Sequence, residues 1–388
     1  MKKIVAIALV LCLAFALCAC GAKGEEKNVV KIGVYEPQSG SNGAGGKQEI
    51  LGMQYANQEC PTIEIDGKTY NVELVIADNE SSNDKAVSAA TDLINADVSV
   101  VLGSYGSGVS ISASDTFEQA GVAAIGVTCT NPLVTAGNNH YFRIRFLDPF
   151  QGTVLANFAN TDLGAKTAYC LGELGNDYDQ GLVHYFKEAA EGLGMKVVTA
   201  EFPKDNSDFT SYLTNAKNEG ADVIFAPCSI SYVQLLIEQA AAQGIEMPLL
   251  GSDTWDSNAV LAAAEGKDVE IYVSTFYAEG GNPEFEMGIK DWLNSNSDAM
   301  TNNGGNDMIS AVTVMGYDAY YTALEAVKKA GSADKADILA VMPSVTYNGI
   351  SGAIAFDDIG DAVRDSAYIK TANTADVLWD FVTVATVD

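Results

Sequence analysis

Histidine is scarce in this chain of 388 residues, which contains only His140 and His184. No two of its seven cysteines have the Cys-x-x-Cys spacing, so the sequence indicates neither a zinc site nor a disulfide-dense scaffold. Neither Ser104 nor Ser107 has the flanking glycines of a nucleophile elbow, and Cys129 has no histidine near it in the sequence. We therefore expect no enzymatic activity, no bound metal and no cofactor.

Basic residues are also few, with 22 Lys and Arg against 51 Asp and Glu and a net charge of −29. Such a surface repels nucleic acid, and the sequence supplies no basic patch that could hold phosphates. The glycine-rich segment 40–48 lacks the spacing of a phosphate-binding loop, since Ser41 and Gln48 stand at two of its required positions. The acidic segment 78–84 lacks the glycine and the distal glutamate of a calcium loop.

Long apolar runs are absent except near the N-terminus, where IVAIALVLCLAFAL follows two lysines in the layout of a secretory signal. The end of this run, Leu-Cys-Ala-Cys-Gly, resembles a bacterial lipobox with Cys20 as the lipidated residue. We expect residues 1–19 to be a lipoprotein signal peptide and 20–28 a lipid-anchored tether. The mature protein would lie on the outer face of the bacterial cell membrane or in the periplasm. An ordinary signal peptide with incidental cysteines is the alternative.

From residue 29 onward, short apolar runs alternate with amphipathic segments. Continuous apolar runs separated by helices indicate a parallel sheet covered on both faces. The pattern restarts after about residue 150, which predicts an α/β protein with two doubly wound lobes and a ligand site at the carboxyl ends of the strands. The expected strands are 29–36, 70–78, 98–104 and 123–128 in the first half, and 166–172, 196–202, 222–228, 247–252 and 270–276 in the second.

Polar residues follow several of these strands. Ser107 comes where a strand runs into a helix, so its hydroxyl and the free helix N–H groups are typical of a carboxylate site, with a plain helix cap as the alternative. Asp253 directly follows an apolar strand and suits an ammonium counter-charge or a helix cap. Tyr178 has an equivalent position after another strand.

Taken together, these segments resemble the type I periplasmic binding proteins, specifically the leucine/isoleucine/valine-type substrate-binding lipoproteins of ABC transporters. The resemblance is carried by VVKIGVYEPQSG, SGVSISASDTFEQAGVAAIGVTCTNP, YDQG, GSDTW and YDAYYTALEAVKKAGS. It implies two Rossmann-like lobes joined by a three-crossing hinge. Lobe 1 would comprise roughly 29–146 and 275–344, and lobe 2 roughly 147–274 and 345–388.

The resemblance also implies a set of ligand-binding residues. The ligand carboxylate would be held by Ser107, the ammonium by Asp253, and both groups by the loop after the fourth strand. The residues at these positions are Ser107, Thr128, Cys129, Thr130, Tyr178 and Asp253. Cys129 would contribute only its backbone and a small side chain.

Two departures from the family pattern concern the side-chain pocket. Ser229 stands where an aromatic residue is common, and Gly45 replaces a bulky residue of the first loop. Both changes remove bulk, so a ligand larger than valine or leucine is expected, with Trp255 and Tyr232 lining the pocket.

These observations predict a monomeric receptor that captures a branched-chain or larger apolar or aromatic amino acid and delivers it to an ABC permease and its ATPase. Two alternatives remain open: a receptor of the same fold for an aromatic carboxylate or small amide, and a ligand-sensing receptor without transport.

Overall fold

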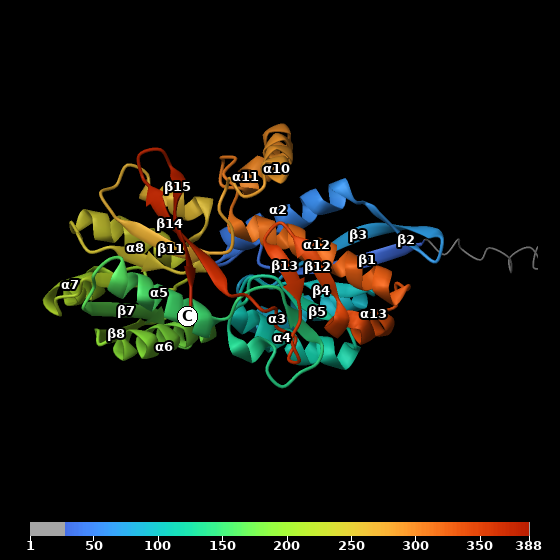
Figure 1. The fold of residues 1–388 in the computed structure, drawn as a ribbon, viewed down its shortest axis with the longest axis horizontal. Helices are drawn as coiled ribbons and strands as arrows, with labels where there is room; N and C mark the ends of the chain where they lie inside the picture. The colour runs from blue at the N-terminus through green and yellow to red at the C-terminus, as the bar shows by residue number, and fades with distance from the viewer. Residues whose placement is uncertain (1–27, 388) are drawn as a thin grey trace, which may run out of the picture.

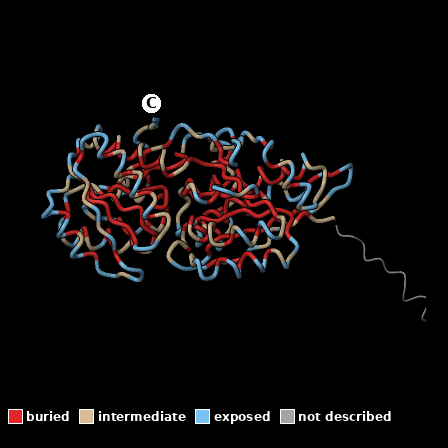
Figure 2. The backbone as a smooth tube through the Cα atoms, turned by 90° about the horizontal axis from the view of Figure 1, so that it is seen from below, coloured by how far each residue is buried: buried red, intermediate tan, exposed pale blue. Residues whose placement is uncertain are grey.

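The computed structural model describes residues 28–387, which form two lobes that lie side by side (Figure 1). Each lobe is built around its own sheet, one of six strands and one of seven. Buried residues fill the interior of both lobes, and exposed residues surround them (Figure 2). The prediction of an α/β protein with two doubly wound lobes is confirmed.

The first sheet has the strand order β2-β3-β1-β4-β5-β6, and all of its strands are parallel except β2. Its strands are β1 (Val29–Glu36), β2 (Thr62–Ile65), β3 (Lys68–Asp78), β4 (Val100–Leu102), β5 (Ala124–Gly126) and β6 (Tyr141–Arg143). Side chains alternate between faces along β1: Val30, Ile32 and Val34 join one core, whereas Tyr35 joins another. Both faces are therefore buried, as expected for continuous apolar strands.

The helices of this lobe cover both faces of the sheet. The long helix α12 packs against α2 on one face, and α3 packs against α4 on the other. The helices are α2 (Gly43–Glu59), α3 (Asn83–Asn95), α4 (Ser107–Ala120), α10 (Pro283–Ser295), α11 (Ser297–Asn302), α12 (Ala311–Ala330) and α13 (Lys335–Val341), with 3-10 turns η1 (Pro132–Val134) and η3 (Met342–Ser344).

The second sheet has the order β15-β14-β11-β10-β9-β7-β8, with β7 to β11 parallel and β14 and β15 antiparallel at one edge. Its strands are β7 (Thr167–Glu173), β8 (Lys196–Phe202), β9 (Val223–Phe225), β10 (Leu249–Gly251), β11 (Ile271–Thr275), β14 (Ser366–Asn373) and β15 (Leu378–Thr386). The helices of this lobe are α5 (Asp148–Thr161), α6 (Asp177–Gly192), α7 (Thr210–Asn218), α8 (Ile230–Ala242) and α9 (Asn258–Ala264), with the 3-10 turn η2 (Asp253–Trp255).

The chain passes between the lobes three times: after β6, after β11 and before β14. A separate hairpin of β12 (Thr346–Gly349) and β13 (Gly352–Ala355) precedes the last crossing and contacts α12. The boundary drawn at 344/345 from the sequence assigned this hairpin to lobe 2, whereas its contacts place it with the helices of lobe 1. The hairpin is followed by β14 and β15, which join the sheet of lobe 2, and the sequence alone does not show that the lobes change between β13 and β14.

Candidate functional site

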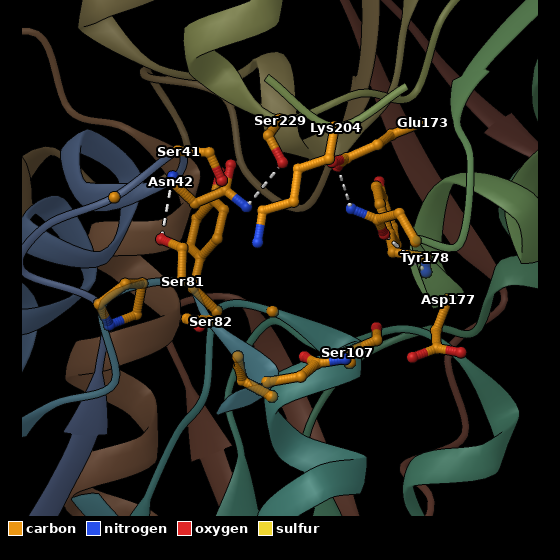
Figure 3. A pocket seen from close by; sticks show the side chains of 18 of the residues that line it. Ser41, Asn42, Ser81, Ser82, Ser107, Glu173, Asp177, Tyr178, Lys204 and Ser229 are labelled. Atoms are coloured by element: carbon orange, nitrogen blue, oxygen red, sulfur yellow. Dashed lines mark hydrogen bonds between the residues drawn. The ribbon is translucent and has the colours of Figure 1, made fainter. Parts of the chain in front are cut away.

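A cavity of 440 Å³ lies between the lobes, where the carboxyl ends of both sheets face each other. Loops after β1, β3 and β4 line one side, and loops after β7, β8, β9 and β10 line the other. Figure 3 shows these side chains converging from the two lobes. The volume is within the range of about 300–1,000 Å³ that is usual for small-molecule sites.

Ser107 lines this cavity from lobe 1, at the first position of α4. Its hydroxyl oxygen accepts hydrogen bonds from the backbone N–H groups of Thr130 and Asn131, both at 3.2 Å. The hydroxyl hydrogen therefore remains available for a ligand. Because Gly106 provides no side-chain cap, the first N–H groups of α4 are also open to an anionic group.

Asp253 and Tyr178 line the cavity from lobe 2 and are bonded to each other. The Tyr178 hydroxyl donates to Asp253 Oδ1 at 2.7 Å. Burial, followed by the nearby Asp253 carboxylate, raises the pKa of Tyr178 well above its ordinary value, so the phenol stays a donor. Asp253 is only 4% exposed and also accepts from Gln151 Nε2 at 2.7 Å.

Arg145 lies behind the cavity lining, paired with Asp253, and the sequence analysis did not single it out. Its guanidinium is buried and donates to Asp253 Oδ2 at 3.2 Å, while its central carbon lies 3.6 Å from the centre of the Phe276 ring. Burial raises the pKa of Glu49 to about 7 and also raises that of Asp148, and the nearby charge of Arg145 opposes both rises. The signal was present in RIRFLDPFQG, since an arginine within a buried apolar run needs a buried counter-charge.

Asp148, at the start of α5, is fully buried behind Asp253. The pKa of Asp148 is raised from 3.8 to about 7, chiefly by burial; the nearby Asp253 carboxylate contributes to the rise, and the hydroxyl of Thr130 and the two nearby arginines oppose it. The folded protein therefore holds a proton on Asp148 at pH values where the unfolded chain has lost it.

We expect Asp148→Asn to make the protein less sensitive to rising pH. Because the folded pKa is the higher one, the wild type loses stability as pH rises from about 4 to about 7, and the asparagine does not. Between pH 4 and pH 8, the free energy of unfolding of the variant should rise by on the order of 3 kcal/mol relative to that of the wild type. Thermal unfolding at a series of pH values measures this difference, and parallel curves for the two proteins would contradict it.

The loop of Thr128, Cys129 and Thr130 lies behind Ser107 and does not line the cavity. Thr128 donates its hydroxyl to Glu49 and offers its carbonyl to Arg145. Cys129 is buried, and burial raises the pKa of its thiol. The structure thus gives these three residues a supporting position, where the sequence analysis expected direct ligand contact.

The expected enlargement of the side-chain pocket is only partly supported. Ser229 and Tyr232 do line the cavity. The space beside Gly45, however, is filled by the Tyr105 ring, which a Cβ at this position would overlap. Trp255 is fully buried against Gly251 and does not reach the cavity, so the prediction that it lines the pocket is wrong.

The lining of the cavity is polar and acidic. Lys204 is the only basic residue among the described residues that line it, whereas the acidic ones are Glu80, Asp84, Glu173, Asp177, Asp205 and Asp253. Asn42 is another lining residue that the sequence analysis did not single out.

Direct hydrogen bonds join the lobes around the cavity. Asn42 in lobe 1 donates to Ser229 Oγ and accepts from the N–H of Ile230 at the start of α8, both at 3.1 Å. On the other side, Asn131 donates to the carbonyl of Asp177 at 2.8 Å. The structure therefore represents a closed arrangement of the lobes.

Among residues 28–387 there is no cluster of side chains that could hold a metal ion, and no helix there is long and apolar enough to cross a membrane. The four cysteines in this part of the chain, Cys60, Cys129, Cys170 and Cys228, are free. The predicted lipidation site at Cys20 lies outside the described residues.

Comparison with known proteins gives a consistent result. A family model for periplasmic binding proteins matches residues 29–375. The Leu/Ile/Val-binding protein homolog 2 of Brucella abortus is 28% identical over 93% of this chain and 94% of its own. The leucine binding protein LivK of Thermotoga maritima has a TM-score of 0.80 and 29% identity over 92% of this chain and 99% of its own. A further similar structure is the branched-chain amino acid transporter substrate binding protein LivJ of Streptococcus pneumoniae, solved with isoleucine. Its TM-score is 0.78, with 26% identity over 92% of this chain and 99% of its own. The chain therefore belongs to the periplasmic binding protein family, in the type I group that contains the Leu/Ile/Val-binding proteins.

Proposed function

We propose that this protein is the extracytoplasmic substrate-binding component of an ABC importer and captures an α-amino acid in the cavity between its lobes. One observation carries the proposal: two groups of polar residues face the same cavity from opposite lobes. Lobe 1 contributes Ser107 and the open N-terminus of α4, and lobe 2 contributes Tyr178 and Asp253. A carboxylate and an ammonium on one small molecule match these two ends.

The ligand carboxylate would accept hydrogen bonds from the Ser107 hydroxyl and from the first backbone N–H groups of α4. The ammonium would face Asp253. Arg145 donates to Asp253 Oδ2, whereas Oδ1 accepts from the uncharged Tyr178 hydroxyl and Gln151 amide, so the ammonium would approach Oδ1.

Closure of the lobes brings the two ends together around the ligand. A ligand shifts such an equilibrium only through its higher affinity for the closed form. A zwitterion that contacts both lobes binds the closed form more tightly, because in the open form it can contact the binding groups of only one lobe at a time. The closed lobes would then present a surface for the permease, and lipidated Cys20 would hold the protein at the membrane as a monomer.

We expect Ser107→Ala to weaken amino-acid binding at least tenfold. The variant loses a hydrogen bond to a charged carboxylate, which is worth about 1.5–3 kcal/mol. Isothermal calorimetry with a panel of amino acids measures the change. Ser114→Ala is the matched control, since it removes a serine hydroxyl from the same helix outside the cavity lining. Equal affinities for wild type and Ser107→Ala would remove Ser107 from the site.

A receptor for a carboxylate without an amine is the second candidate. It is favoured by the ion pair of Arg145 with Asp253, which already supplies this acid with a cation. Thermal shift with leucine and with its deaminated analogue 4-methylpentanoate separates the two functions. Greater stabilisation by the analogue would favour the second candidate.

A further inference from the structure

Two carboxylates of the cavity lining are almost fully buried, and they differ in their electrostatic partners. Asp253 is 4% exposed and has the guanidinium of Arg145 at 3.2 Å. Glu173, at the end of β7, is 9% exposed and takes part in none of the ion pairs found within residues 28–387. Its charge is therefore the one in the lining that is both buried and uncompensated.

Neutral groups hold the Glu173 carboxylate in place. The Tyr232 hydroxyl donates to Oε1 at 3.2 Å, and Asn176 Nδ2 donates to Oε2 at 3.0 Å. Tyr232 is itself fixed, because its oxygen accepts the backbone N–H of Asp205 at 3.0 Å. These bonds orient the carboxylate at the cavity and leave its net charge unchanged.

Lys204 is the nearest candidate for an internal counter-charge, and it does not fill that role. Its ammonium has neither a hydrogen bond nor an ion pair within the described chain, and the residue is exposed. Figure 3 shows its side chain extending into the middle of the cavity. A long exposed lysine can move aside for a ligand, whereas Glu173 is fixed at the end of a strand.

We infer that the amino acid captured here carries a positively charged group at the end of its side chain and that Glu173 receives it. This inference rests on the proposed function, in which Ser107 and Asp253 hold the α-carboxylate and α-ammonium. A cation at Glu173 compensates a buried charge, and a guanidinium or ammonium donates charge-assisted hydrogen bonds to the carboxylate. An aliphatic side chain at the same place removes water from the Glu173 carboxylate and returns no hydrogen bond.

The test compares ligands that differ in charge and little in shape. Arginine and citrulline form one pair, and lysine and norleucine form the other. We expect calorimetry to show that arginine binds the purified protein at least tenfold more tightly than citrulline. Lysine should likewise bind more tightly than norleucine. In Glu173→Gln the preference should fall to less than threefold. Glu80→Gln is the matched control, because it neutralises an exposed carboxylate of the lining and should keep the full preference.

The outcomes separate this inference from the proposed function. If neutral amino acids such as leucine bind and the cationic ones have no advantage, the inference is wrong and the proposed function stands. If glutamate binds more tightly than glutamine, Lys204 selects the ligand and the inference is also wrong. If no amino acid binds, the proposed function itself fails. The ligand comparison in the wild type decides the inference even if Glu173→Gln does not fold.

Discussion

Replacing Gly52 with alanine should destabilise the protein by about 3 kcal/mol or more, the largest stability effect that we expect from a single methyl group. Gly52 lies where α2 crosses α12, and a Cβ there would fall on the carbonyl oxygen of Thr313 and within 2.7 Å of the backbone nitrogen of Tyr317. Gly316 makes the reciprocal approach from α12 to the backbone of Glu49. Backbone atoms on both sides cannot rotate away, so the helices must separate.

Thermal unfolding measures this effect, which corresponds to a fall in Tm of at least about 6 °C for a lobe of this size. Gly192→Ala is the control, because Gly192 ends α6 and a Cβ there would meet nothing within 4 Å. Alanine at this position should stabilise the protein slightly, since glycine is the poorer helix former. A Tm for Gly52→Ala equal to that of the wild type would show that the two helices can move apart at little cost.

The second large effect concerns Arg145. Arg145→Met should lower the free energy of unfolding by about 3–5 kcal/mol, because removal of one partner leaves the buried Asp253 carboxylate without its cation. The loss should increase with pH, since burial has already raised the pKa of Asp148 to about 7 and the arginine holds it below a still higher value.

The double variant Arg145→Met with Asp253→Asn provides the decisive comparison. It removes both charges, and the asparagine oxygen can still accept from Gln151 and Tyr178. We expect urea unfolding to show that the double variant recovers most of the stability lost in Arg145→Met. If the double variant is as unstable as the single one, the ion pair is not the reason for the loss.

Some of the candidate site follows from local pattern. Ser107, Tyr178 and Asp253 were expected at the cavity because each follows an apolar strand, Ser229 was expected there from the family resemblance, and all four line it. Parallel strands bring their carboxyl ends to one edge of a sheet, so the position of a residue just after a strand predicts where it lies. The loop of Thr128 to Thr130, which the resemblance placed in contact with the ligand, instead packs behind Ser107, and the backbone N–H of Thr130 donates to the Ser107 hydroxyl oxygen.

The sequence by itself determined the α/β class, the two lobes and the edge at which the cavity forms, because these depend on the periodicity of apolar residues along short segments. Only the tertiary structure decided which distant residues meet there. Arg145 and Asp253 lie more than a hundred residues apart, and their pairing depends on how one lobe faces the other. The filling of the space at Gly45 by Tyr105, and the uncharged Tyr232 hydroxyl that meets Glu173, are likewise set by packing between segments that no local pattern connects. Periodicity dictates which face of a segment is buried, whereas the order of the strands and the closure of the lobes dictate its neighbours.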